Sequence, residues 1–308
     1  MSIKLACFQP SGSVSSDKNS FEKMALACCS KLLFIGCEKM KTRISYKKLL
    51  KSYCSVISVL VGIETFILIF KDIPDNKKEL AAIINIIIFS IIFIILLLVS
   101  VKMSKIKLNI HGTNVIVKFG DLFNESGKKV IGCNEYFDSL VDEKLISSNS
   151  LNGKVIKRYI SDIDDFDNKI SCDLGCNNNI IQKNCKKKIG KNTKYKLGTC
   201  FKYKDYIFVA FSKFDEQYRA YLDMPDYLFC LTNFWIELNR VYNGENIVVP
   251  LLGSGITRIG NSNITKQEQL TLIIDSLKYS NLVFTHDATI TIILPESLKH
   301  EIRLFNLK

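Results

Sequence analysis

The chain has 308 residues and a formal net charge of +12 at pH 7. A basic excess of this kind suits binding to anionic lipid or to nucleic acid, but 36 of the 42 basic residues are Lys and no nucleic-acid-binding motif accompanies them. We therefore expect a membrane surface, and not nucleic acid, as the partner. The 11 cysteines are scattered and miss the common zinc spacings, so we predict neither a disulfide framework nor a metal site.

Residues 1–52 precede the first strongly apolar run. Their N-terminus lacks the basic start and apolar core of a signal peptide. Residues 24–37 are moderately apolar, but they are too short and too interrupted to cross a membrane. We expect 1–52 to be a cytoplasmic segment, which either forms a helix or lies on the bilayer surface.

Two apolar runs follow, at residues 53–70 and 80–101, separated by the charged residues 71–79. About 18 to 22 helical residues suffice to cross a hydrocarbon core of about 30 Å, so the pattern predicts a transmembrane hairpin over 53–101. The second run contains no charge, whereas the first has Glu64 near its middle. An ionised carboxylate is costly in lipid, so Glu64 should face the partner helix, another subunit or water. A shallow or re-entrant first segment is the alternative.

Basic residues stand at the outer ends of both runs. Six precede the first run and three follow the second: Lys39, Lys41, Arg43, Lys47, Lys48, Lys51, Lys102, Lys105 and Lys107. Because Lys and Arg are retained in the cytoplasm, both termini and the domain after the hairpin are expected inside the cell. This pattern predicts a multi-pass protein of the bacterial inner (cell) membrane.

Alternating strand and helix patterns run from residue 105 to the end of the chain. Strands are predicted at 105–110, 114–120, 128–134, 195–203, 206–214, 246–250 and 288–295, and helices at 151–160, 224–242 and after Thr265, with a short amphipathic helix at the C-terminus. We interpret 161–194 as a polar insertion and its acidic stretch, Asp162 to Asp167, as a solvated loop. Residues 105–308 should therefore form one α/β domain.

Two features of the predicted helices are specific. Thr265 and Glu268 form a capping box that marks a helix start. In 224–242, a set of apolar residues recurs at helical spacing and is expected to pack in the core: Leu228, Leu231, Trp235, Leu238 and Val241.

Two loops have the composition of anion-binding sites. Gly253, Ser254 and Gly255 follow a predicted strand, so their backbone amides could bind phosphate without steric hindrance, and Arg258 could add a charged contact. An ordinary turn is the alternative. The second loop places Ser150, Asn152 and Gly153 at a helix start, where the helix dipole favours an anion.

The order of four elements resembles a divergent macro domain, the α/β/α module that binds ADP-ribose. The elements are FGDLF (119–123), VIGCNEYFDS (130–139), SLNGKVI (150–156) and VVPLLGSGITRIG (248–260). Together with the hairpin, they resemble the membrane-anchored macro-domain effectors of Thoeris anti-phage defence. The resemblance implies an N-terminal two-helix transmembrane hairpin followed by a macro-like α/β/α domain with a mixed sheet.

The resemblance also assigns ligand contacts. Asp121 would accept a hydrogen bond from the adenine amino group, and Asn134 would contact the distal ribose. As alternatives, Asp121 caps the segment after it, Asn134 stabilises its turn, and Asp138 either meets a ligand hydroxyl or caps a helix. The remaining implied contacts form the two phosphate loops: Ser150, Leu151, Asn152 and Gly153, and Gly253, Ser254, Gly255, Ile256, Thr257 and Arg258.

The chain differs from the hydrolytic members of the family in the sequence elements that those members use for catalysis. Gly132 to Glu135 replace the usual Asn-Ala-Ala-Asn run, and the first loop keeps only Gly153 of a glycine triplet. We therefore expect a sensor that binds its ligand without turning it over and has no catalytic residue or cofactor.

In such systems a TIR-domain partner makes an ADP-ribose-derived signal, histidine-ADP-ribose. The signal would drive assembly of a homo-oligomer whose hairpins disrupt the membrane, in an abortive-infection response. A membrane-tethered ADP-ribosyl hydrolase and a non-catalytic anchored interaction module are the alternatives.

Overall fold

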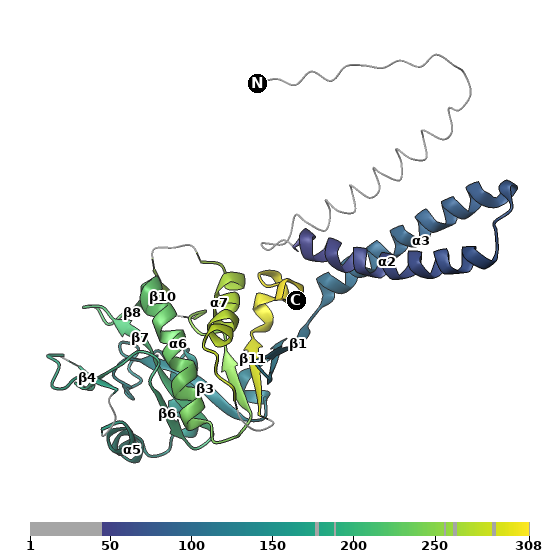
Figure 1. The fold of residues 1–308 in the computed structure, drawn as a ribbon. Helices are drawn as coiled ribbons and strands as arrows, with labels where there is room; N and C mark the ends of the chain where they lie inside the picture. The colour runs from purple at the N-terminus through teal and green to yellow at the C-terminus, as the bar shows by residue number, and fades with distance from the viewer. Residues whose placement is uncertain are drawn as a thin grey trace, which may run out of the picture. The chain divides into compact units, whose positions relative to one another are not determined.

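The computed structural model describes residues 45–175, 179–187, 189–255, 257–260, 264–284 and 288–307. Most of the predicted segment 1–52 and the predicted site residue Ile256 lie outside these residues. The described chain begins with two long helices, α2 (Tyr46–Phe70) and α3 (Asp75–Lys102) (Figure 1). By length and composition both can cross a membrane. Their apolar side chains are exposed around the helix, which distinguishes them from the core helices of a soluble domain.

The two helices of the hairpin are connected by four residues. We predicted a separating segment at 71–79, but α3 already begins at Asp75, a residue whose charge favours a helix N-terminus. Within the helices, the Asn85 amide donates to Glu64 Oε2 at 3.3 Å, so Glu64 faces the partner helix of its own hairpin. This contact is one of the three alternatives expected from the sequence.

A mixed nine-stranded sheet follows the hairpin. Its order is β1-β2-β11-β9-β3-β7-β8-β10, and β6 pairs with β7 off this path. The strands are β1 (Lys105–Ile110), β2 (Thr113–Phe119), β3 (Lys128–Asn134), β6 (Cys200–Tyr203), β7 (Tyr206–Phe214), β8 (Ala220–Leu222), β9 (Ile247–Pro250), β10 (Arg258–Ile259) and β11 (Thr289–Leu294). The five central strands β2, β11, β9, β3 and β7 are parallel, whereas β1, β6 and β8 pair antiparallel. A small separate sheet pairs β4 (Ile180–Gln182) with β5 (Lys194–Tyr195).

Helices cover both faces of the large sheet. On one face α6 (Met224–Val241) and α7 (Lys266–Tyr279) share a core with the strands, and on the other face α4 (Leu151–Tyr159) and α5 (Ile163–Gly175) share a second core. Central parallel strands are buried on both sides, which explains why β9 is a continuous apolar run with every residue buried. The result is the predicted α/β/α arrangement, with α6 and α7 lying side by side in Figure 1.

The capping box that starts α7 is confirmed. The Thr265 hydroxyl accepts from the Glu268 backbone N–H at 3.2 Å, and Glu268 Oε2 accepts from the Thr265 N–H at 2.8 Å.

The buried face of α6 differs in part from the predicted one. Leu228 is 42% exposed, because the buried face is shifted toward Tyr227, Cys230 and Phe234.

Three other sequence interpretations are wrong. The region taken as a polar insertion contains α5, whose Phe166, Ile170 and Leu174 are buried at four-residue spacing. The acidic stretch is not a loop throughout, because Asp164, Asp165 and Asp167 lie in α5, and the exposed Asp162 accepts from the Asp165 N–H at 2.8 Å before the helix begins. The expected C-terminal amphipathic helix is instead two 3-10 turns, η2 (Glu296–His300) and η3 (Leu304–Leu307).

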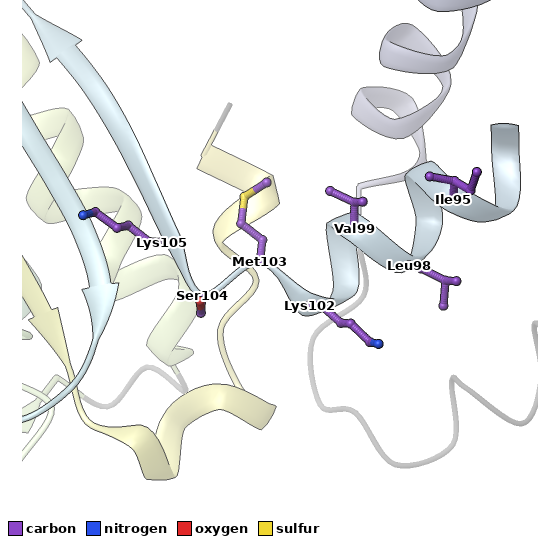
Figure 2. Close-up of a pocket in the computed structure, with 7 residues that line it drawn as sticks. All are labelled: Ile95, Leu98, Val99, Lys102, Met103, Ser104 and Lys105. Carbon is purple, nitrogen blue, oxygen red and sulfur yellow. The ribbon is translucent and has the colours of Figure 1, made fainter.

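The connection from α3 to β1 is short. Met103 packs against the domain core, and the Ser104 carbonyl accepts from the Phe119 N–H at 3.3 Å. A groove of about 520 Å³ lies at this connection, lined on α3 by apolar side chains and flanked by Lys102 and Lys105 (Figure 2).

Candidate functional site

The candidate site lies where the central parallel strands end. In parallel sheets the carboxyl ends of the strands share one edge, and ligands bind in the loops there. Asp121 follows β2, Asn134 is the last residue of β3, and Gly253 follows β9. The sheet topology therefore brings three sequence-predicted elements, which are far apart in the chain, to one edge.

Asp121 follows β2 and precedes a single 3-10 turn, η1 (Leu122–Asn124). Its Oδ1 atom accepts from the Phe123 N–H at 3.0 Å, so the capping role expected as an alternative is present. The side chain is exposed. Its Oδ2 atom has no hydrogen bond to any described residue and can accept one from a ligand.

The turn after β3 is strained and tightly held. Phe137 has φ of 50°, a left-handed conformation that is unfavourable for a bulky residue. Asn134 Oδ1 accepts from the N–H of Tyr136 at 2.9 Å and of Asp138 at 3.4 Å, which fixes the turn. Asn134 is only 4% exposed, so it has the turn-stabilising role given as its alternative.

Asp138 is buried beneath a strap formed by residues 179–187 and 189–194. Its Oδ1 accepts from the Lys191 N–H at 2.6 Å, and its Oδ2 from the Lys187 ammonium at 3.0 Å. The Lys191 ammonium pairs with Asp167 Oδ1 at 2.6 Å. Burial lowers the pKa of Lys191, and the neighbouring Asp167 and Asp138 oppose this shift. Both oxygens of Asp138 thus have internal partners in this arrangement.

The first phosphate loop precedes α4. Ser150 is the N-cap: its Oγ accepts from the Gly153 N–H at 2.9 Å and donates to the Ser147 carbonyl at 2.7 Å. A Cβ on Gly153 would lie 2.2 Å from that carbonyl oxygen, so only glycine allows the loop to approach the helix this closely. Asn152 is 6% exposed, and its buried Oδ1 has no partner among the described residues. Leu151 is half-buried beside it.

The second phosphate loop follows β9 and is held from the helix side. Gly253 has φ of 82°, which favours glycine. Its carbonyl accepts from Gln269 Nε2 at 3.4 Å, and the Ser254 carbonyl accepts from the Lys266 ammonium at 3.1 Å. Gly255 is exposed with open space around its Cα. These contacts fix the loop backbone through its carbonyl groups.

The rest of this loop leads into the outer strand β10. Thr257 precedes the strand and is half-buried, and Arg258 begins it with an exposed side chain. Sequence reasoning missed the two α7 residues that hold the loop, Lys266 and Gln269. The capping box was the available signal, because it places both residues in the first turn of a helix.

Comparison with known proteins assigns the family. The model described as "Thoeris protein ThsA, Macro domain" matches residues 115–295, more than half of the chain. This chain belongs to the Thoeris ThsA family. A ThsA from Bacillus amyloliquefaciens (strain Y2), named "Thoeris protein ThsA", is 36% identical over 260 residues, covering 82% of this chain and 87% of that protein. The expected resemblance to the Thoeris family is therefore confirmed.

Solved structures similar to this ThsA-family chain are macro domains. The Oceanobacillus iheyensis macrodomain with ADP is 12% identical and has a TM-score of 0.41, covering 66% of this chain and 95% of that one. The same macrodomain with MES bound is 12% identical, has a TM-score of 0.44, and covers the same shares.

Proposed function

We propose that this ThsA-family chain is a membrane effector of bacterial anti-phage defence whose macro domain senses an ADP-ribose derivative. The signal we propose is histidine-ADP-ribose made by a TIR-domain partner. One observation carries the proposal: a macro-type α/β/α domain is joined within a few residues to two apolar helices whose length and composition suit a membrane span. Binding by the domain is then physically connected to the bilayer.

The candidate site supports binding of a nucleotide diphosphate. Asp121 offers a carboxylate oxygen where the family binds the adenine amino group. The first loop ends at the N-terminus of α4, where the helix dipole and unpaired backbone amides favour an anion. The second loop is glycine-rich and carries the Lys266 ammonium at its edge. We assign the diphosphate to these two loops.

We propose that the domain binds its ligand without hydrolysing it. Asn134 and Asp138, near the position of the family's catalytic turn, are buried and already hydrogen-bonded within the protein. Such groups are not available to hold a scissile bond and its water. A membrane-tethered hydrolase would instead release ADP-ribose from the adduct, so mass spectrometry of the bound ligand after incubation distinguishes the two functions.

Charge supports an orientation with both ends of the hairpin in the cytoplasm. Its base carries six lysines: Lys47, Lys48, Lys51, Lys102, Lys105 and Lys107. At the tip, three lysines are balanced by three acids: Lys71, Lys77, Lys78, Asp72, Asp75 and Glu79. Because positive charge is retained inside and attracted to anionic lipid, the neutral tip should cross the membrane.

Assembly of the hairpins is the proposed output. A ligand favours an assembled state only if it binds that state more tightly than the resting state. In lipid, polar contacts and close packing drive helix association, and Glu64 and Asn85 are the polar pair that this hairpin offers. The proposed product is a homo-oligomer that disrupts the inner membrane.

Binding is tested with the full chain in lipid nanodiscs. Calorimetry with ADP-ribose and with histidine-ADP-ribose should show saturable binding, with the adduct preferred and recovered intact. Recovery of free ADP-ribose in place of the adduct would establish the hydrolase, and absence of binding by either compound would leave only an anchored interaction module.

A further inference from the structure

The C-terminal residues 296–307, here called the joint, connect the macro domain to the base of the hairpin. At one end of the joint, the Arg303 N–H donates to Gln267 Oε1 at 2.7 Å. At the other end, Asn306 Oδ1 accepts from the Ser45 N–H at 2.9 Å, and the Asn306 carbonyl accepts from the Lys48 ammonium. The Asn306 N–H donates to the Arg303 carbonyl at 3.1 Å, which closes the connection between the two ends.

The connection continues to the second phosphate loop. Gln267 lies in the first turn of α7, between Lys266 and the same turn's Gln269. Lys266 and Gln269 hold the carbonyl groups of Ser254 and Gly253, respectively. Every step from the loop to the first turn of α2 is thus a hydrogen bond or a neighbouring position on one helical turn.

The buried residues of the hairpin helices lie at the joint. Leu49 is the buried residue of α2 and Ser100 the buried residue of α3; the other described positions of both helices are at least partly exposed. Both residues lie at the base of the hairpin, where α3 contacts η3. Within the joint, Ile302 and Leu304 are each 1% exposed, so the joint cannot shift without moving what packs on it.

Unsatisfied hydrogen-bond donors in the joint would favour a rearrangement that pairs them. Arg303 is only 5% exposed, and its Nε and Nη2 atoms have no hydrogen-bond partner among the described residues. The Nε2 atom of Gln267 also has no hydrogen-bond partner among the described residues. Buried donors without acceptors raise the free energy of the state that contains them. A rearrangement that pairs these donors would therefore favour another position of the joint.

We propose that the joint transmits ligand occupancy from the second phosphate loop to α2, with Gln267, Arg303 and Asn306 as its positioning residues. This inference rests on the proposed function and names the regulation of the same site. A diphosphate at the loop attracts the Lys266 ammonium away from the Ser254 carbonyl. The first turn of α7 moves with Lys266, Gln267 carries the movement to Arg303, and Asn306 carries it to α2.

The test uses the full chain in nanodiscs for binding and in dye-loaded vesicles for leakage, with ADP-ribose as the probe. Asn306→Ala and Lys48→Ala should bind ADP-ribose with the affinity of the wild type. Their ligand-induced leakage should be about tenfold lower, because a tenfold effect is typical of allosteric coupling. Asn306→Asp keeps the acceptor for the Ser45 N–H and should retain leakage. Asn114→Ala, an exposed strand residue with no side-chain bond to the described residues, is the matched control.

A second measurement needs no ligand. Because coupling is reciprocal, Gln267→Ala should accelerate hydrogen exchange of the backbone amides at the start of α2, whereas Asn114→Ala should not. Unchanged exchange in Gln267→Ala, or leakage equal to that of the wild type in both Asn306→Ala and Lys48→Ala, would overturn the proposed role of the joint. If the wild type binds neither ADP-ribose nor histidine-ADP-ribose while Gln267→Ala still accelerates exchange at the start of α2, the proposed function fails and the connection through the joint stands.

Discussion

Replacing Gly153 by alanine tests whether the first phosphate loop is built as described. The new Cβ would lie 2.2 Å from the Ser147 carbonyl oxygen, whereas ordinary contact begins at 3.4 Å. The loop backbone must therefore move by about 1 Å, a large displacement for a packed site. The same carbonyl accepts from the Ser150 N–H at 3.0 Å and from its hydroxyl at 2.7 Å, so this movement also disturbs the cap of α4.

The cost follows from these two effects. Overpacking costs about 1–3 kcal/mol and loss of a helix cap about 1 kcal/mol, so Gly153→Ala should lose roughly 2–4 kcal/mol. For a domain of this size, the melting temperature should fall by roughly 4–16 °C. A displaced loop should also lose at least one hydrogen bond to the diphosphate, which weakens ADP-ribose binding by about tenfold or more.

The assay uses the single tryptophan, Trp235, which is fully buried in the core of the macro domain and reports its unfolding. Gly175→Ala is the matched control, because a Cβ there meets nothing within 4 Å. Calorimetry with ADP-ribose on both variants completes the comparison. A melting temperature and an affinity for Gly153→Ala equal to those of Gly175→Ala would refute the reasoning.

Substitutions at three further positions test the rest of the site. Asp121→Ala should lower ADP-ribose affinity by about tenfold and also lower the melting temperature reported by Trp235. Asp121→Asn keeps the capping oxygen and should lower the affinity alone. Equal affinities for both variants and the wild type would exclude the adenine contact. Asp138→Ala leaves the Lys187 ammonium buried without its partner and should cost about 3–5 kcal/mol in urea unfolding, and a loss below about 1 kcal/mol would contradict this. Burial raises the pKa of Glu135 above its ordinary value of 4.5, so the folded chain holds this proton more tightly and wild-type stability falls as pH rises through that range. The stability of Glu135→Gln relative to the wild type should therefore increase from about pH 4 to about pH 7, and a constant difference would count against the shift.

The sequence predicted the features that depend on local pattern. Long apolar runs can only be spanning or fully buried helices, and short apolar runs bounded by turn residues predicted the strands of the large sheet except the short β8 and β10. The capping box at Thr265 and the glycine loop at Gly253 were equally visible, because each depends on residues a few positions apart.

Other features depend on contacts between distant residues. Helix α5 was missed because Phe166, Ile170 and Leu174 are spaced correctly but surrounded by acidic and polar residues that lower the apolar content. The partners of Asp138 are about 50 residues away in the chain, and only the fold of the strap brings them together. The joint was invisible for the same reason, since Asn306 and Ser45 lie near opposite ends of the chain.

Dye release from vesicles is the most direct test of the central claim that ligand binding in the macro domain opens the membrane. The full chain is reconstituted in vesicles that contain anionic phospholipid and titrated with histidine-ADP-ribose, alongside the Gly153→Ala variant. We predict release that saturates with the ligand in the wild type and shifts to at least about tenfold higher concentration in the variant. Wild-type vesicles that stay intact at ligand concentrations that saturate the macro domain would contradict the claim.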